Sequence, residues 1–185
     1  MTATARARDP GVTNETRPGG LEGELRYELS PDLVTLAEGR AAEAEAIRTI
    51  RTHMVARHLE DGRRGLAMCA ATSGVGCTFT AVNLAVALAQ AGVATLLIDA
   101  DLRTPQVERF IRPETPRAGL KDCLDAEDYS LSDYIHPEVI PNLSIMYSGG
   151  VADNPQELLA RDSFRRLIER CLRDFEFTIV DTTAA

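Results

Sequence analysis

A glycine-containing loop lies between two hydrophobic runs of the sequence, at Ala71–Thr78. Gly76 and Thr78 fit the phosphate-binding pattern G-x-x-x-x-G-K-[ST]. Ala71 stands in place of its first glycine, and Cys77 stands in place of its lysine. In such a loop the backbone N–H groups turn inward around a phosphate, and the helix that follows adds its positive N-terminal end. The residues expected to contact the phosphates are Ser73, Gly74, Val75, Gly76, Cys77, Thr78 and Phe79.

The predicted pocket lacks the cation that normally neutralises bound phosphates. The only lysine of the chain is Lys121, far beyond the loop. An arginine or a neighbouring subunit could supply positive charge, but no lysine of the loop can. The sequence therefore predicts a phosphate cradle with a weakened electrostatic contribution.

Three aspartates follow apolar runs that read as strands. Asp99 and Asp101 come after the run at 94–98, and Asp181 comes after the run at 177–180. Because parallel strands end at one edge of a sheet, we expect the three carboxylates to converge near the loop. Mg²⁺ takes oxygen ligands from one or two carboxylates, hydroxyls, water and phosphate, which Thr78 and these aspartates could provide. A single such aspartate would indicate only a turn or cap; three beside a glycine loop favour a metal-nucleotide site.

The hydrophobic pattern around these residues predicts strands that alternate with helices. We expect strands at 66–70, 94–98, 143–147 and 177–181, and helices at 80–90 and from 154 to about 172. A further helix is expected from Ser30-Pro31, interrupted at Gly39 and resuming over 41–59, with short helices near 105–110, 119–125 and 130–135. Continuous apolar strands are typical of a parallel sheet covered on both faces. The alternation therefore predicts an α/β fold.

The two ends of the chain differ in character. Residues 1–30 are polar, rich in glycine and proline and without apolar periodicity, and we predict that they are disordered. Residues 31–185 are predicted to form one domain. The chain ends four residues after Asp181, beside the edge where such sheets bind ligands. We therefore expect a sheet that is short on its C-terminal side, either because the chain is truncated or because a partner covers it.

Composition excludes several classes of function. The net charge of −8 and the isoelectric point of about 4.9 disfavour a nucleic-acid surface, which would be basic. The four cysteines are widely spaced, which favours reduced thiols over a zinc site or a disulfide framework. No apolar run approaches the roughly 18 residues of a membrane span, and no secretory signal is recognisable. These features predict a cytoplasmic protein.

Several segments resemble bacterial tyrosine kinases, the cytoplasmic kinase modules of capsule and exopolysaccharide export systems and relatives of Min- and Par-type ATPases. Residues 96–105, L-L-I-D-A-D-L-R-T-P, resemble the Walker A′ segment of that family. Residues 74–78 lie where its Walker A motif lies, and 179–182 lie where its Walker B motif lies. The segments 119–124 and 154–159 are also similar to the family. The resemblance implies a P-loop NTPase-like parallel sheet flanked by helices.

The resemblance also implies roles for individual residues. Thr78 would bind Mg²⁺ directly, and Asp99 and Asp181 would hold it directly or through water, together with ATP or ADP. Asp101 would take the proton from an incoming tyrosine hydroxyl. Arg103 would lie beside the acidic cluster. Asp101, Asp99 and Arg103 are thus the expected catalytic residues.

A charged helix upstream carries Glu45, Arg48 and Arg51 at three-residue spacing. Spacing alone favours a solvated face with internal i,i+3 pairs. The resemblance reverses that interpretation, because the family uses an E-x-x-R-x-x-R helix for ring assembly. We therefore expect this helix to contact a neighbouring subunit.

The chain departs from the family at Cys77 and also at Ser73 and Thr183, where many members carry proline, and it lacks the family's C-terminal tyrosine cluster. These departures predict a tyrosine-kinase-like protein of exopolysaccharide or capsule biosynthesis and export with impaired catalysis. Such a protein would act as a regulatory or assembly partner of a membrane polysaccharide co-polymerase, at the inner face of the membrane. An active ATP-dependent tyrosine autokinase is the alternative, and a Par-type positioning ATPase is a third, less favoured hypothesis.

Overall fold

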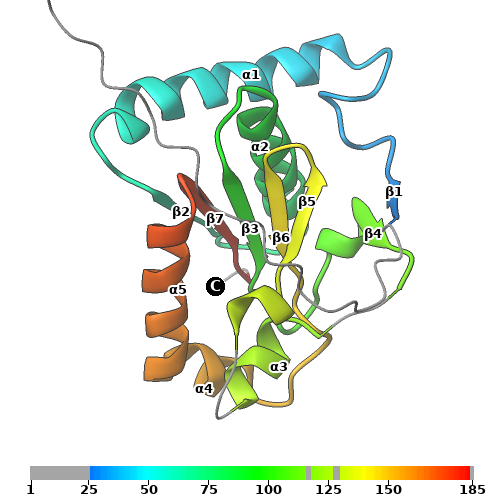
Figure 1. The fold of residues 1–185 in the computed structure, drawn as a ribbon. Helices are drawn as coiled ribbons and strands as arrows, with labels where there is room; N and C mark the ends of the chain where they lie inside the picture. The colour runs from blue at the N-terminus through cyan, green and yellow to red at the C-terminus, as the bar shows by residue number, and fades with distance from the viewer. Residues whose placement is uncertain (1–25, 116–117, 127–129, 184–185) are drawn as a thin grey trace, which may run out of the picture.

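A computed structural model of the chain describes residues 26–115, 118–126 and 130–183 (Figure 1). The predicted disorder of residues 1–25 lies outside the described residues. The architecture is a central, mostly parallel sheet with helices on both faces, as the alternating pattern predicted.

The central sheet has five strands in the order β2-β7-β3-β6-β5. The strands are β2 (Gly65–Met68), β7 (Phe177–Asp181), β3 (Thr95–Asp99), β6 (Leu143–Met146) and β5 (His136–Ile140). The first four are mutually parallel, and β5 runs antiparallel to β6. The parallel strands therefore bring their carboxyl ends to one edge, where a ligand would bind.

Successive residues of the central strand β3 enter different cores. Leu97 packs with α2 (Cys77–Gln90), whereas Leu96 and Ile98 pack with Leu167 of α5 (Asp162–Asp174). Because side chains alternate across a strand, both faces of the sheet must be covered. This explains why the strand sequences are continuously apolar rather than alternating.

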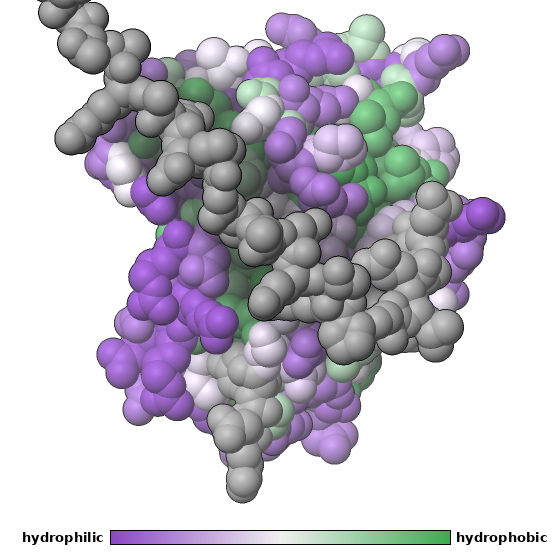
Figure 2. Space-filling view, viewed as in Figure 1, coloured by the Kyte–Doolittle hydropathy of each residue, from purple (hydrophilic) through white to green (hydrophobic). Residues whose placement is uncertain are grey.

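The helices differ in how deeply they are buried. Every residue of α2 from Ala81 to Ala89 is buried, because the sheet covers one side and α1 (Ala41–Met54) covers the other through Ala44 and Ile47. A short π-helix, η1 (Val55–Leu59), continues α1. The outer surface over α5 is strongly hydrophilic (Figure 2). The remaining helical elements are α3 (Leu120–Asp125), α4 (Pro155–Ala160), η2 (Val107–Arg109) and η3 (Leu131–Asp133).

The predicted helix over 31–39 is wrong, because this segment forms a series of turns before α1 begins at Ala41. The side chain of Asn83 accepts a hydrogen bond from the backbone N–H of Val34 (2.8 Å) and donates one to the carbonyl of Asp32 (3.0 Å). Backbone groups that a helix would have paired internally are therefore satisfied by α2. Gly39, with a φ of +83°, belongs to the turns that precede α1 and does not interrupt a helix.

The single helix predicted from 154 to 172 is divided. Arg161 has extended backbone angles (φ −68°, ψ 149°) between α4 and α5. Its guanidinium donates a hydrogen bond to Asp125 at 3.1 Å, so the break faces the end of α3. The division turns the two helices relative to one another and lets both cover the same face of the sheet (Figure 1).

Two pairings of strands were not predicted. β1 (Tyr27–Leu29) pairs antiparallel with β4 (Ile111–Pro113), so the predicted disorder of residues 1–30 is wrong at 27–29. The sequence did not predict β5, because Pro137 interrupts its apolar pattern and its register with β6 is irregular. The β1–β4 pairing joins segments more than 80 residues apart, which local periodicity does not reveal, whereas β5 and β6 form a hairpin through residues 141–142.

Candidate functional site

The glycine loop lies between β2 and α2, as its sequence context predicted. Gly74 and Gly76 have φ values of +78° and +91°, which side chains with a Cβ rarely adopt. No heavy atom lies within 4 Å of the position that a Cβ would take on either glycine. Because α2 begins at Cys77, directly after Gly76, its free N–H groups complete a cradle open to a ligand.

The loop forms one wall of a cavity of about 330 Å³. The turn after β3 forms a second wall, and the two threonines after β7 form a third. The lining residues are Ala70, Thr72, Ser73, Gly74, Val75, Gly76, Cys77, Thr78, Phe79, Asp101, Arg103, Thr104, Gln106, Phe110, Thr182 and Thr183. All seven loop residues predicted from the sequence, together with Asp101 and Arg103, therefore share one cavity.

Asp181 ends β7 beside this cavity and is fully buried. Neither of its carboxylate oxygens makes a hydrogen bond of ordinary geometry with a described residue. The hydroxyl of Thr78 lies close enough to lower the pKa of Asp181, which indicates a contact that is near but imperfect. Just beyond, Thr182 donates from both its backbone N–H (3.0 Å) and its hydroxyl (2.9 Å) to the carbonyl of Met68.

Asp99 lies opposite Asp181 in the sheet register, and its carboxylate holds the turn that follows β3. One oxygen accepts a hydrogen bond from the N–H of Asp101 (3.2 Å), and the other accepts one from the N–H of Val107 (3.1 Å). The predicted metal ligand Asp99 is therefore already engaged by the backbone through both oxygens.

Burial perturbs both carboxyl groups. Desolvation is the main cause that raises the pKa of Asp99 to about 7, hydrogen bonds from Val107 and Asp101 oppose it, and the charges of Asp181 and Asp101 add to it. Desolvation also raises the pKa of Asp181 to about 6, with a smaller opposing contribution from Thr78. Without a cation, Asp99 is therefore protonated in part at neutral pH, and Asp181 becomes protonated as the pH falls below about 6.

The turn at Asp101 carries the remaining predicted catalytic residues. One oxygen of Asp101 accepts hydrogen bonds from the N–H groups of Arg103 (3.1 Å) and Thr104 (2.8 Å). The other accepts one from the Thr104 hydroxyl at 3.0 Å. These bonds fix the backbone of the turn beside the cavity, while the side chain of Arg103 is exposed.

Cys77 supplies no charge to the cradle. Desolvation first, then the charges of Asp181 and Cys69, raise the pKa of its thiol above the ordinary value. The thiol therefore stays neutral at physiological pH. Among the residues that line the cavity, Arg103 is the one cation.

One wall of the cavity has an aromatic corner, of which Phe79 was predicted from the sequence and Phe110 was not. Phe79 and Phe110 meet edge to face with ring centroids 6.3 Å apart, and the guanidinium of Arg40 lies 5.7 Å from the Phe79 centroid. Phe110, Thr104 and Gln106 all come from the segment after β3, whose path depends on Asp99. The segment 105–110 was predicted as a short helix, but its sequence carries no sign that it lines a cavity.

The described residues fit a magnesium site of the kind that completes its shell with water and phosphate. No group of three or more His, Cys, Asp or Glu side chains within the described part of the chain is arranged to hold a metal ion alone. The buried, unpartnered oxygens of Asp181 and the hydroxyl of Thr78 nevertheless provide hard oxygen ligands next to the cradle.

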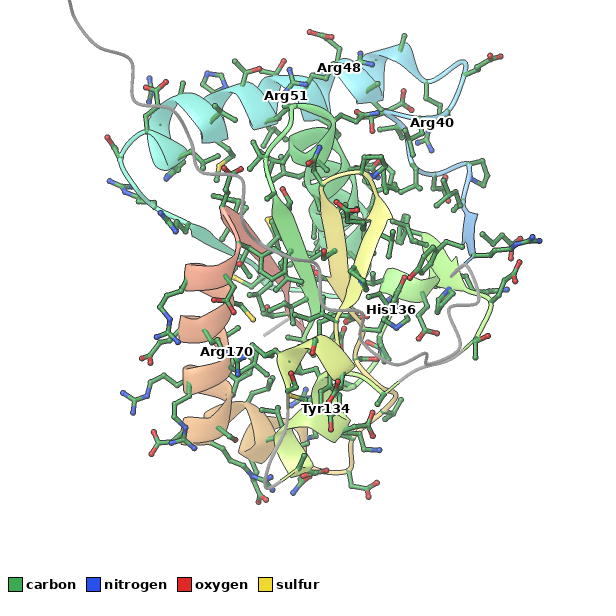
Figure 3. The ribbon with its side chains drawn as sticks, viewed as in Figure 1. Arg40, Arg48, Arg51, Tyr134, His136 and Arg170 are labelled. Atoms are coloured by element: carbon green, nitrogen blue, oxygen red, sulfur yellow. The ribbon has the colours of Figure 1, made fainter. Side chains whose placement is uncertain are left out.

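The predicted interface residues lie on α1 and are not among the residues that line the cavity. Arg48 and Arg51 are labelled on this helix in Figure 3. Glu45 and Arg48 form an i,i+3 ion pair at 3.6 Å, which matches the solvated-face interpretation for that pair. Arg51 forms no ion pair with a described residue and borders, with Glu45 and Arg48, a surface groove of about 230 Å³. The self-association prediction is not tested by these contacts.

No helix in the described ranges is both long enough and apolar enough to cross a membrane.

Comparison with known proteins gives concordant results. The family described as "AAA domain" matches residues 64–185. The chain is 32% identical over 168 residues to the putative tyrosine-protein kinase EpsB of Ralstonia solanacearum, covering 86% of this chain and 22% of that protein. It is 30% identical over 139 residues to the putative tyrosine-protein kinase CapB of Staphylococcus aureus, covering 75% of this chain and 60% of that protein.

A solved structure shares the fold. The chimerical protein CapA2B2 superposes with a TM-score of 0.71 at 28% identity, covering 84% of this chain and 68% of that chain. The present chain thus spans about a fifth of the length of EpsB and three fifths of the length of CapB.

Proposed function

We propose a function for this chain from the family to which it belongs, the AAA-domain family, and from its homology to bacterial tyrosine-protein kinases. The chain binds a magnesium nucleotide in the cavity beside its glycine loop, and it transfers phosphoryl groups poorly. The observation that carries the proposal is Asp181. A fully buried carboxylate with unpartnered oxygens is costly unless a ligand compensates it. The Thr78 hydroxyl and the open cradle lie beside it.

The chemistry follows from the neighbours of this carboxylate. The N–H groups of the loop and of the first turn of α2 would bind phosphate oxygens. Thr78 and Asp181 would hold Mg²⁺, and Asp99 would act on it through water while keeping the turn in place. When bound, the magnesium nucleotide supplies the phosphoryl group for transfer.

Asp101 would accept the proton of a tyrosine hydroxyl. Its Oδ2 accepts a single hydrogen bond from described residues, that of Thr104, so it retains capacity for another. Its position on the cavity wall satisfies the requirement that a general base reach the proton it removes.

Cys77 weakens both binding and catalysis in this proposal. The position at the start of α2 normally offers a lysine to the β- and γ-phosphates. A neutral thiol removes one unit of charge where negative charge accumulates, and loss of such stabilisation typically costs about two or more orders of magnitude in rate. Ser73 and Thr183, which replace prolines of the family, change the walls of the same cavity.

Calorimetric titration with ATP, with and without Mg²⁺, tests the proposal. We expect weak binding that needs Mg²⁺, and binding about tenfold tighter for Cys77→Lys, because a charged hydrogen bond to phosphate is restored. The matched control is Cys77→Ser, which keeps size and neutrality and should bind as the unmodified chain does. If Cys77→Lys is folded and binds no nucleotide, the loop is not a phosphate site.

An active autokinase is the second candidate, favoured by the position of Asp101 on the cavity wall. Incubation with Mg²⁺ and ATP should give little phosphotyrosine. Robust phosphotyrosine that Asp101→Asn abolishes would contradict impaired catalysis and establish the kinase.

We also propose that α1 mediates self-association through Glu45, Arg48 and Arg51. Sedimentation at low ionic strength should show an assembly that Arg48→Ala/Arg51→Ala dissociates, since exposed ion pairs are sensitive to screening. The control is Arg165→Ala/Arg166→Ala on the hydrophilic face of α5. Equal masses for the unmodified chain and the α1 variant would contradict the interface.

The proposed setting is polysaccharide export at the cytoplasmic face of a membrane, as a regulatory or assembly partner of a polysaccharide co-polymerase. Deletion of the gene should lower extracellular polysaccharide. If the role is assembly, Asp101→Asn will restore the polysaccharide and Arg48→Ala/Arg51→Ala will not. Failure of Asp101→Asn to complement would instead indicate that phosphoryl transfer is required.

A further inference from the structure

The cavity contains one cationic side chain among its lining residues, and it comes from the turn after β3 and not from the loop. Arg103 borders this cavity and also an adjoining groove of about 420 Å³ that is lined by residues 151–157. The side chain is exposed and forms no ion pair with any described residue. Arg103 is therefore an uncompensated charge next to a phosphate cradle that lacks its own.

The backbone that carries Arg103 is firmly held. Asp101 accepts hydrogen bonds from the N–H groups of Arg103 and Thr104. Leu102 is fully buried, and its carbonyl accepts a hydrogen bond from the N–H of Ala152 at 2.9 Å. The Cα of Arg103 is thus fixed at the mouth of the cavity, while its long side chain keeps freedom to meet a ligand.

The nearby acids do not neutralise this guanidinium. Both oxygens of Asp101 accept hydrogen bonds from its own turn. In the adjoining groove, one oxygen of Glu157 accepts a hydrogen bond from the Asn154 side chain at 3.0 Å. The chain's single lysine, Lys121, donates to the carbonyl of Val151 at 3.2 Å and does not line the cavity.

We propose that Arg103 supplies the positive charge for the nucleotide's terminal phosphates that the residue at position 77 has lost. The inference rests on the proposed nucleotide binding and adds the residue that neutralises the phosphates. A guanidinium suits this role because it presents several N–H donors in a planar fork that binds two phosphate oxygens at once. The charge thus enters from the turn after β3 instead of from the first turn of α2.

A double-mutant cycle at positions 77 and 103 tests the proposal. Calorimetry with ATP and Mg²⁺ is run on the unmodified chain, Arg103→Ala, Cys77→Lys and Cys77→Lys/Arg103→Ala. We expect Arg103→Ala to weaken ATP binding at least tenfold, as loss of a charged hydrogen bond would. The same change should cost less than threefold once lysine occupies position 77, because the two cations serve the same phosphates.

Matched measurements separate charge from structure. Arg103→Lys should keep most of the affinity, and Arg166→Ala, an exposed arginine on α5, should bind ATP as the unmodified chain does. Arg103→Ala should reduce the affinity for ADP less than the affinity for ATP, because ADP lacks the γ-phosphate that the guanidinium would contact. Arg103→Gln keeps the length of the side chain without its charge and should behave as Arg103→Ala does.

Three negative results are distinguishable. If the unmodified chain binds ATP and folded Arg103→Ala binds it equally well, the inference is overturned while the proposed function stands. If neither the unmodified chain nor Cys77→Lys binds ATP, the proposed function fails and the role of Arg103 fails with it. Equal losses from Arg103→Ala in both backgrounds would show that Arg103 does not replace the lysine.

Discussion

The ends of β3 and β7 carry the same sequence feature and use it differently. Each strand finishes in an aspartate, and the two residues lie opposite each other in the sheet, both fully buried. Asp99 accepts two backbone hydrogen bonds, whereas neither oxygen of Asp181 is satisfied by a described residue. One carboxylate therefore builds the turn beside the site, and the oxygens of the other are left open for the proposed ligand.

The chain that follows each strand explains this difference. After β3 it makes a wide turn, and the bond from Val107 to Asp99 closes that turn over eight residues. After β7 it is held by Thr182, which donates twice to Met68 on the adjacent strand β2. Because Thr182 performs the structural task there, Asp181 is free of it. An aspartate at a strand end is thus left available to a ligand where another residue holds the backbone.

The largest expected effect comes from removing the structural carboxylate. At pH 5, where Asp99 is mostly protonated, Asp99→Ala should lower the free energy of unfolding by about 3 kcal/mol, because two buried N–H groups lose their acceptors. Urea denaturation measures this loss. Asp181→Ala is the matched control, since it leaves a similar cavity but takes no acceptor from a backbone N–H group. Equal losses in the two variants would contradict the distinction between the strand ends.

Removing the other carboxyl group should have the opposite sign. At pH 8, Asp181→Asn should raise the free energy of unfolding by about 2 kcal/mol in the absence of Mg²⁺, because an uncompensated buried charge is removed. The same variant should lose the gain in ATP affinity that Mg²⁺ gives. Destabilisation of the metal-free variant at pH 8 would show that Asp181 has a structural partner.

The pH dependence follows from the same carboxyl groups. The pKa of Asp181 is raised from 3.8 to about 6, and that of Asp99 to about 7, so the folded chain binds these protons more tightly than the unfolded chain does. Their contribution to stability is fully present below about pH 4 and is lost as the pH rises through 6 and 7. Metal-free protein should therefore lose stability between about pH 4 and 7, and Asp181→Asn should lose less. Parallel curves for the two proteins would contradict the assignment to Asp181.

A smaller effect is expected at Thr182, which holds the chain after β7 as Asp99 holds the chain after β3. Thr182→Val should lower the free energy of unfolding by about 1 kcal/mol, because the hydroxyl bond to the Met68 carbonyl is lost while the backbone bond remains. Thermal unfolding measures the change, with Thr183→Val as the neighbouring control. A negligible effect would indicate that Asp181 holds the strand end after all.

The smallest effect on stability is expected at Asp101. Asn at this position keeps one oxygen for the N–H groups of Arg103 and Thr104, so Asp101→Asn should change the free energy of unfolding by less than about 1 kcal/mol. Circular dichroism during denaturation tests this. Any residual phosphotyrosine formation should disappear in the same variant. Asp101→Asn would then abolish phosphoryl transfer while leaving the free energy of unfolding almost unchanged.

Most of the sheet and the outline of the site could be predicted from the sequence. The apolar runs that became β3 and β7 are strong local signals, and the loop before Cys77 has a pattern with a known geometry. The exception at 31–39 shows the limit of such reasoning. That segment has a helical start signal, yet Asn83 on α2 pairs its backbone groups instead.

The sequence by itself determined which residues meet at the edge of the sheet, because strand ends, glycine positions and helix starts are encoded locally. Only the tertiary structure decided what each residue does there. Asp99 and Asp181 look equivalent in sequence and are both buried. They differ because Asp99 accepts hydrogen bonds from the N–H groups of Asp101 and Val107 and Asp181 accepts none from a described backbone N–H group. Arg103 likewise acquires its position from Asp101 and Ala152. Hydrogen-bond partners and desolvation are set by segments far apart in the chain, and no local pattern specifies them.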